Sequence, residues 1–269
     1  MPTVPPRPAF KKSLGQHHLR HPELCLPAID FLRPRDRVVL EIGPGGGVLT
    51  VELMIAGATV VGLELDRSWA FELQRRTRGR RLSMVVADGL EWCWERLQPH
   101  HLVAGNLPFN VASPIIEAFA TRASAVERAV FLVQDEVARR LTAAPGNRDY
   151  GMSTVLVGAW AEVSMLSRVR PGSFEPVPRV WGAFIGLRRR EPPLPALEMK
   201  SFRKTVAAGF RQRRKTLANS LRSAWGREPS VAALSLSGLD GGRRAETLSV
   251  ADFAALHRGY LEAIGGKAE

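Results

Sequence analysis

The sequence predicts an α/β fold, in which a doubly wound parallel sheet is followed by a small helical C-terminal domain. Two observations predict it. Between about residues 36 and 135, short apolar runs alternate with stretches of helical spacing, which is typical of a parallel sheet with crossover helices. After the proline-rich segment at 190–198, apolar residues recur at helical spacing. We therefore expect one domain at 1–189 and a second at 190–269.

Five apolar runs are the predicted strands of the alternating region, because each is short and flanked by turns or helix-like stretches. They lie at 37–43, 59–65, 83–88, 101–106 and 129–134. The loop at 144–151, which contains Pro145, Asn147 and two glycines, ends the alternation. Two further strands near 160–166 and 181–187 are expected to complete the sheet. In the C-terminal domain, helical spacing runs through 202–225 and 250–264.

The composition indicates a globular protein with an anionic partner. A chain of 269 residues that is 45% hydrophobic can bury a sizeable core. The 38 lysines and arginines outnumber the 26 acids, and the net charge of +12 favours nucleic acid over a membrane surface. Residues 188–222 contain eleven of these lysines and arginines but only two glutamates. This stretch therefore carries +9 of the net charge of +12. The alternative to nucleic-acid contact is a solvated helix face.

Other function classes are disfavoured by what the sequence lacks. Cys25 and Cys93 have no paired spacing, so we expect reduced thiols and neither a metal knuckle nor a disulfide framework. The start of the chain has no apolar core segment or cleavage-site pattern, and no run approaches the roughly 18 apolar residues of a membrane span. We therefore expect a cytoplasmic protein without membrane contact.

A glycine-dense turn follows the first predicted strand. In "EIGPGGGVLTVEL", Gly43, Gly45, Gly46 and Gly47 precede a helix that begins near Val48, so a ligand could approach the backbone closely. The Gly-x-Gly-x-x-Gly pattern of NAD sites is not completed, and the Gly-Lys-Ser/Thr ending of ATPase loops is absent. The turn predicts a nucleotide-type cofactor, with a purely structural tight turn as the alternative.

Acidic residues stand at the ends of the next two predicted strands. Glu64 stands twenty-one positions after Gly43, where such folds bind the two ribose hydroxyls of a nucleotide, and Asp66 is the alternative. Asp88 ends the third run, where a carboxylate can accept a hydrogen bond from an adenine amino group. An acid at a strand end is usually a helix cap when it is taken singly, but these acids and the glycine turn fall on three consecutive strand ends.

Together these positions resemble the cofactor site of class I S-adenosylmethionine-dependent methyltransferases, whose sheet is Rossmann-like. The resemblance implies that Gly43 to Gly47 pass beneath the methionine part of S-adenosyl-L-methionine. It also implies that Glu64 holds the ribose and that Asp88 contacts the adenine of the cofactor.

The stretch "NLPF" ends the fourth predicted strand, beside the methyl group in such a site. The side-chain carbonyl of Asn106 and the backbone carbonyl of Leu107 could accept hydrogens from an exocyclic amine. Pro108 would fix the turn, and Phe109 would stack on an unpaired base. A simple strand-to-turn transition is the alternative. The stretch is similar to the signature of amino-group methyltransferases, in the Asn-Leu-Pro-Phe/Tyr form of the family that dimethylates ribosomal RNA adenines.

Further motifs along nearly the whole chain resemble that rRNA adenine dimethyltransferase family. They are "KKSLGQHHL" (11–19), "VQDEVARRL" (133–141) and "SFEPVPRVWGAF" (173–184). The resemblance implies cofactor contacts at His17 and Leu19. "RQRRKTLANSL" (211–221) and "RRAETLSVADFAAL" (243–256) look like the C-terminal domain of the KsgA-type branch, which acts on small-subunit rRNA. The Erm-type branch, which acts on large-subunit rRNA, usually lacks both.

This chain departs from the family pattern at three places. His17-His18 stands where the family has Asn-Phe, Gly182 replaces an expected serine, and Phe109 replaces the commoner tyrosine. A hydrogen bond that the family's asparagine makes near the carboxylate of the cofactor would therefore come from an imidazole or be lost. His17, His18 and His21 have no nearby cysteine or carboxylate cluster, so we expect no metal.

The reaction that the resemblance implies is attack of adenine N6 on the sulfonium methyl, performed twice per base without a covalent enzyme intermediate. The expected partner is rRNA within the 30S subunit or its precursor, bound by a monomer. Arg211, Arg213, Arg214 and Lys215 are expected to bind the RNA backbone, unless some of them brace their own helix. The alternatives are an Erm-type 23S rRNA methyltransferase that confers macrolide resistance and an RNA-binding assembly factor without turnover; an NAD-dependent oxidoreductase is disfavoured.

Overall fold

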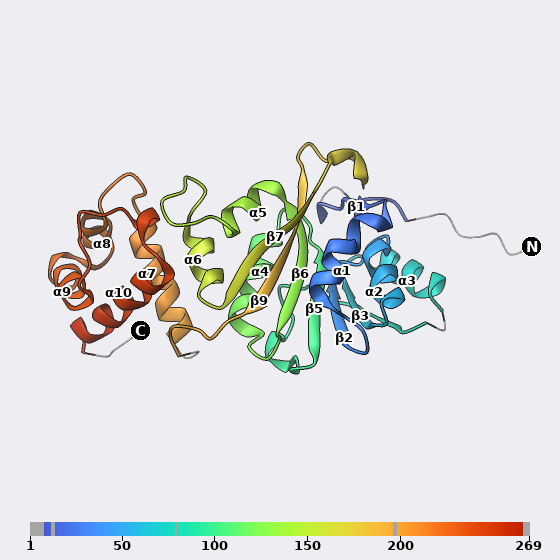
Figure 1. Cartoon of the computed structure of the whole chain (residues 1–269), viewed down its shortest axis with the longest axis horizontal. Coiled ribbons are helices and arrows are strands. Elements are labelled where there is room, and N and C mark those ends of the chain that lie inside the picture. Colours follow the sequence, from blue (N-terminus) through green and yellow to red (C-terminus); the bar gives the residue numbers. More distant parts are fainter. Residues whose placement is uncertain (1–7, 12–13, 79, 196–197, 266–269) are drawn as a thin grey trace, which may run out of the picture. The chain divides into compact units, whose positions relative to one another are not determined.

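The computed structural model describes residues 8–11, 14–78, 80–195 and 198–265 (Figure 1). The chain forms two compact units. The first contains the chain as far as Ala138 together with Val163–Arg189, and the second contains Arg139–Glu162 and the residues from Arg190 onward. The division at 189/190 therefore coincides with one boundary between the units, while 139–162 groups with the C-terminal part. Residues 1–7 of the predicted first domain and residues 12 and 13 of the motif at 11–19 lie outside the described residues.

A seven-stranded sheet forms the centre of the first unit, in the order β4-β3-β2-β5-β6-β9-β7. Its strands are β2 (Val38–Ile42), β3 (Thr59–Glu64), β4 (Leu82–Val86), β5 (His101–Asn106), β6 (Arg128–Gln134), β7 (Ala161–Val169) and β9 (Gly182–Arg189). The pairs from β4 to β6 are parallel, and β9 runs antiparallel to β6. The predicted α/β sheet is confirmed, and all five strands predicted in the alternating region form within two residues of their expected limits.

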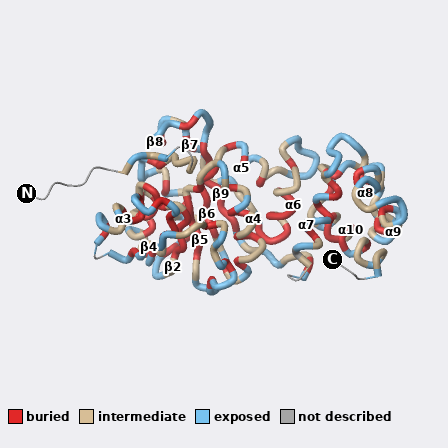
Figure 2. The backbone as a smooth tube through the Cα atoms, turned by 180° about the vertical axis from the view of Figure 1, so that it is seen from behind, coloured by how far each residue is buried: buried red, intermediate tan, exposed pale blue. Residues whose placement is uncertain are grey.

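The burial of the strands explains why their sequences are continuous apolar runs. β5, β6 and β9 are buried along almost their whole length, because a sheet covered on both faces offers few positions to water. β4 lies at the edge and is largely exposed. The helices of this unit are α1 (Leu26–Leu32), α2 (Val48–Ile55), α3 (Arg67–Arg76), α4 (Ala112–Arg122) and the start of α5 (Asp135–Leu141). Figure 2 shows the buried residues concentrated along the central strands.

A second, two-stranded sheet joins distant parts of the sequence. β1 (His18–Leu19) pairs antiparallel with β8 (Phe174–Glu175), so that His18 lies opposite Glu175 and Leu19 opposite Phe174. The N-terminal motif and the Phe-x-Pro-x-Pro motif are thereby held together. Neither strand was predicted, because two residues carry no detectable alternation.

The second unit is helical. Its helices are α6 (Met152–Gly158), α7 (Met199–Phe210), α8 (Leu217–Trp225), α9 (Arg227–Ser237) and α10 (Val250–Ala263). The helical spacing predicted through 202–225 is interrupted at 211–216, where the chain turns between α7 and α8, and α9 was not predicted. α10 begins with a capping box, in which Ser249 Oγ accepts from Asp252 N and the Asp252 carboxylate accepts from Ser249 N. No helix in the described ranges is long and apolar enough to cross a membrane.

Candidate active site

The topology of the sheet creates a crevice between β2 and β5. The strand order runs from β2 through β3 to β4 on one side and from β5 to β6 on the other, so the chain switches direction between β2 and β5. Ligands of open α/β sheets bind at such a switch point, beyond the carboxyl ends of the strands. Gly43 follows the end of β2, and Asn106 ends β5.

The glycine turn between β2 and α2 has a backbone conformation and close packing that other residues would not fit. Gly43 and Gly45 have φ angles of +67° and +50°, which L-residues seldom adopt and glycine adopts readily. A Cβ on Gly45 would also lie 2.5 Å from Nε2 of His18, so the imidazole packs directly on the backbone of the turn. His18 is itself buried, with its ring 4.5 Å from that of Trp69.

Glu64 anchors this turn from the end of β3. Its carboxylate oxygens accept from the backbone N–H of Gly45 at 3.0 Å and of Asp66 at 2.9 Å. Burial raises the pKa of the Glu64 carboxyl, and the hydrogen bonds from Asp66 and Gly45 oppose that change. The buried carboxyl therefore both fixes the glycine turn and lines the crevice.

Asp66, the alternative for ribose binding, has a different set of partners. Its carboxylate caps α3 through Ser68 N at 3.0 Å, forms an ion pair with Lys11 Nζ at 3.0 Å and accepts from Gln16 Nε2 at 3.3 Å. Burial alone would raise the pKa of Asp66, but these hydrogen bonds outweigh it and lower the pKa. Asp66 thus ties the N-terminal segment to the sheet and does not line the crevice.

The crevice contains a cavity of about 200 Å³. Seven of the predicted site residues line it: His17, Gly43, Glu64, Asp88, Asn106, Leu107 and Pro108. The remaining lining residues were not among the predicted site residues: Leu14, Gly15, Gln16, His18, Leu65, Asn110 and Val111. The motif at 11–19 was the available signal for the N-terminal ones, and the rest lie within two residues of predicted site residues.

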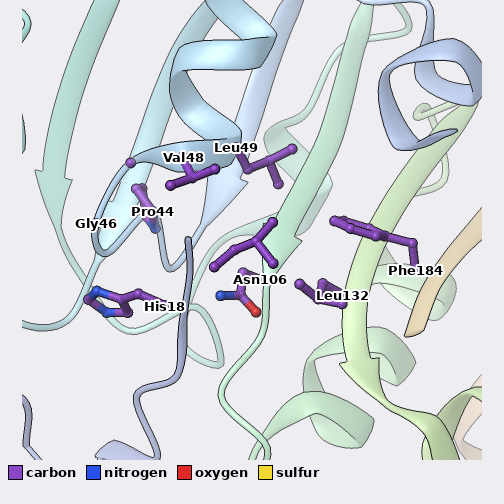
Figure 3. Close-up of a pocket in the computed structure, with 10 residues that line it drawn as sticks. His18, Pro44, Gly46, Val48, Leu49, Asn106, Leu132 and Phe184 are labelled. Atoms are coloured by element: carbon purple, nitrogen blue, oxygen red, sulfur yellow. The ribbon is translucent and has the colours of Figure 1, made fainter. Parts of the chain in front are cut away.

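A smaller cavity, which Asn106 also lines, is shown in Figure 3. Its volume of about 10 Å³ leaves room for about one water molecule. The predicted residue Leu19 lines it, together with the glycine turn and the first residues of α2. The predicted residues Gly45 and Phe109 line neither cavity. For Gly45 the reason is that the His18 ring covers it.

Asp88 lies beyond the end of its strand, because β4 stops at Val86 and not at 88 as predicted. Its Oδ1 accepts from the backbone N–H of Leu90 at 2.8 Å, which is the local capping contact expected of an acid in such a loop. One of its oxygens therefore shapes the loop, while the residue also lines the cavity.

The orientation of the Asn106 amide is fixed by one hydrogen bond. Asn106 Nδ2 lies 2.8 Å from the backbone carbonyl of His17, and only the NH₂ end of the amide can donate to a carbonyl. The side-chain carbonyl of Asn106 is therefore left as an acceptor. The next residue, Leu107, is buried and donates its N–H to the Leu132 carbonyl at 3.0 Å, which fixes the chain at the start of the motif.

Aromatic rings surround the end of the Asn-Leu-Pro-Phe motif. Phe109 is half-buried, with its ring centroid 5.2 Å from that of His17 and 6.5 Å from that of Phe174. His17 also makes a contact of 2.7 Å between Nδ1 and the carbonyl of Pro176, so the proton of a neutral ring resides on Nδ1. The other nitrogen, Nε2, is then an acceptor, and it can donate to a cofactor carboxylate only when the ring is protonated.

Glu41 is a buried acid that the sequence did not single out. It lies on β2, is fully inaccessible, and has no hydrogen-bond partner for either carboxyl oxygen among the described residues. Burial raises its pKa to about 8, and the charge of Glu64 reinforces this change. Burial therefore favours the protonated, neutral form of the Glu41 carboxyl, whose position inside an apolar strand run gave no signal in the sequence.

The predicted RNA-binding cations lie in the second unit, in the turn between α7 and α8. Arg211, Arg213, Arg214 and Lys215 are all exposed. Arg213 is engaged within its own unit, because it pairs with Glu246 at 3.4 Å and donates to the carbonyl of Arg148. Lys215 borders an open hollow with Gln212, Asn219, Arg222 and Ser223. The bracing alternative therefore applies to Arg213.

The histidines near the N-terminus are dispersed. His17 contacts Pro176, His18 packs on the glycine turn, and His21 lies 3.6 Å from Glu23. Over the part of the chain that the structure describes, no three His, Cys, Asp or Glu side chains gather in a way that could hold a metal ion.

Comparison with known proteins identifies the family. Residues 7–260 match the family model described as ribosomal RNA adenine dimethylase. The chain belongs to this family. Curated relatives carry the name ribosomal RNA small subunit methyltransferase A. One from Anaeromyxobacter sp. (strain K) is 39% identical over 92% of each chain, and one from Geobacter metallireducens is 39% identical over 96% of this chain and 97% of its own.

Solved structures agree with the assignment to the ribosomal RNA adenine dimethylase family. The 23S rRNA methyltransferase ErmE matches with a TM-score of 0.69 and 27% identity, covering 90% of this chain and 98% of its own. A dimethyladenosine transferase from Plasmodium falciparum matches with a TM-score of 0.75 and 21% identity, covering 89% of this chain and 96% of its own, and it supports the fold alone. The family predicted from the motifs is therefore confirmed, and the chain has a methyltransferase fold.

Proposed function

We propose that this chain is an S-adenosyl-L-methionine-dependent enzyme that dimethylates N6 of adjacent adenines in a hairpin loop of small-subunit (16S) rRNA during 30S biogenesis. The observation that carries the proposal is the orientation of Asn106, whose NH₂ is held by the His17 carbonyl and whose own carbonyl is left to accept. The names of the relatives at 39% identity favour the small subunit over the large one. We further propose that the chain acts as a cytoplasmic monomer on rRNA within the 30S subunit or its precursor.

The residues around the crevice fit a nucleoside cofactor. The cavity of about 200 Å³ is bordered by Gly43, the first residue of the glycine turn, and by the two acidic residues Glu64 and Asp88. Gly43, Glu64 and Asp88 would hold the cofactor, with His17 and Leu19 as further contacts from the N-terminal segment. When bound, the cofactor supplies an electrophilic methyl group on a sulfonium.

The residues of the Asn-Leu-Pro-Phe motif would hold the acceptor amine. The carbonyls of Asn106 and Leu107 accept its hydrogens, which draws the nitrogen lone pair out of conjugation with the base. Phe109, supported by Phe174, offers a ring on which an unpaired base can stack. Positioning supplies most of the rate enhancement, because no covalent intermediate is needed and the amine becomes acidic once it is methylated.

Backbone contacts would come from the second unit. Arg211, Arg214 and Lys215 are exposed in the turn between α7 and α8, and they are suited to phosphate contacts that set affinity and salt dependence. Arg213 would contribute mainly through its contacts with Glu246 and Arg148.

The test incubates the purified chain and radiolabelled S-adenosylmethionine with under-methylated 30S subunits or with protein-free 23S rRNA, and then digests the product to nucleosides. N6,N6-dimethyladenosine from the 30S sample alone is the expected result. Label in 23S rRNA would instead favour an Erm-type activity, for which the 27% identity to ErmE is the supporting observation. Label in neither sample would leave an RNA-binding factor without turnover.

A further inference from the structure

The connection from β7 to β9 carries a large exposed aromatic side chain that the proposed chemistry does not use. Trp181 is 47% exposed, and Val177 and Val180 before it are 61% and 43% exposed. A surface that presents a tryptophan and two valines to water is a candidate for ligand contact. We call Val177, Val180 and Trp181 the Trp181 surface.

This surface stands at the same edge of the sheet as the acceptor site. Asn106 pairs with Leu132 on β6, and two residues further along β6, Gln134 pairs with Gly182, the residue after Trp181. Phe174 connects the two places, because its ring contacts that of Phe109 and its Cζ would lie 2.8 Å from a Cβ on Gly182. The absence of the expected serine at Gly182 is thus explained by the space that the Phe174 ring occupies.

Trp181 is held in place despite its exposure. Its backbone carbonyl accepts from Asp135 N at 2.9 Å. The Asp135 carboxylate binds the guanidinium of Arg168 through two hydrogen bonds of 2.7 and 3.0 Å, and Arg168 Cζ lies 5.1 Å from the centre of the Trp181 ring. The ring is therefore positioned before any ligand binds, which lowers the cost of stacking on it.

The charges of this connection suit a polyanion. Arg170 and Arg179 are exposed, and neither has an ion-pair partner among the described residues. Glu175, in β8, is the one acid between them in the sequence. Aromatic rings combined with arginines are the usual means of holding unpaired nucleotides, in which the base stacks and the phosphate meets a cation.

We propose that Trp181 is a stacking platform for an unpaired base that flanks the methylated adenine, with Arg170 and Arg179 contacting the neighbouring phosphates. This inference rests on the proposed function, because it takes the ligand to be the looped RNA of that function. It assigns the Trp181 surface to single-stranded RNA and not to a protein partner.

Binding of a labelled RNA hairpin with an adenine-containing loop tests the inference, with a fully paired duplex of equal length as the comparison. We expect Trp181→Ala to weaken hairpin binding roughly tenfold and Trp181→Phe to weaken it far less, because a phenyl ring still stacks. Duplex affinity should stay unchanged in both variants. Phe71→Ala is the matched control, since Phe71 is also an exposed ring beneath an arginine, with Arg67 Cζ 5.3 Å from its centre on α3.

Two further readouts separate the possible outcomes. Affinity for S-adenosylmethionine should be the same in all variants, which shows that the first unit is folded, and the KM for under-methylated 30S particles should rise in Trp181→Ala while kcat is retained. The inference is overturned if Trp181→Ala binds the hairpin as the parent chain does, or if hairpin and duplex lose affinity equally. A KM defect on particles with unchanged hairpin binding would assign the surface to a ribosomal protein. Hairpin binding is measured without turnover, so its result stands even if the proposed methylation is not found.

Discussion

The side-chain amide of Asn106 donates a 2.8 Å hydrogen bond to the backbone carbonyl of His17, although the two residues are 89 positions apart. His17 directly precedes β1, and β1 is held by its pairing with β8. The position of the acceptor carbonyl on Asn106 therefore depends on an N-terminal segment that packs over the end of β5.

Replacing Asn106 tests this arrangement. Asn106→Ala removes the acceptor carbonyl, and we expect kcat for methyl transfer to fall by about 10²-fold or more, as for loss of one preorganised polar group. Asn106→Asp keeps an acceptor but loses the donor to His17, so its kcat should lie between that of the parent chain and that of the alanine variant. Radiolabel transfer to under-methylated 30S subunits measures both. Equal activity of Asn106→Ala and the parent chain would remove Asn106 from the reaction.

Glu64, which ends β3, and Asp66, two residues later, should have different effects on cofactor binding. Glu64→Ala removes the acceptor for the Gly45 N–H, so we expect the Kd for S-adenosylmethionine to rise about 10- to 100-fold, the range for a lost buried hydrogen bond to a charged group. Asp66→Ala should raise the Kd less, because Asp66 does not line the cavity, and should mainly lower the melting temperature. Calorimetric titration measures both affinities, and a larger effect at Asp66 would transfer the ribose role to it.

The buried carboxyl of Glu41 should make the first unit less stable as the pH rises. Its pKa is raised from 4.5 to about 8, so the folded chain retains a proton that the unfolded chain has lost between these values. The stabilisation is complete below pH 4.5 and is lost as the pH rises toward 8, at up to about 1.4 kcal/mol per pH unit. Glu41→Gln should remove this slope in urea unfolding measured at several pH values. The same substitution at the exposed Glu23 serves as the control, and an unchanged slope in Glu41→Gln would show that another group titrates.

Arg213 and Lys215 should respond differently to truncation although they are two residues apart. Lys215→Ala should weaken RNA binding and reduce the slope of log affinity against log salt by about 0.7 to 0.9, the value for one lost phosphate contact. Arg213→Ala should mainly lower the melting temperature of the second unit, because it breaks the contacts with Glu246 and Arg148. RNA titrations across a salt series, together with thermal unfolding, distinguish the two effects. A larger salt effect at Arg213 would contradict the bracing role.

The sequence by itself determined the sheet and the positions of several residues that line the crevice. The strands could be predicted because they are buried on both faces and so read as apolar runs, and the glycine turn because it needs backbone conformations that other residues avoid. Since parallel strands end at a common edge, Gly43, Glu64 and Asn106 could be expected to meet there from their sequence positions alone.

Only the tertiary structure decided which partners those groups find. The pairing of β1 with β8, the contact of His17 with Asn106 and the engagement of Asp66 by Lys11 join residues that are remote in sequence, and no local pattern encodes them. The grouping of 139–162 with the C-terminal helices and the interruption at 211–216 have the same origin. Strand and helix patterns report which face of an element is buried, whereas partners depend on how distant elements pack together.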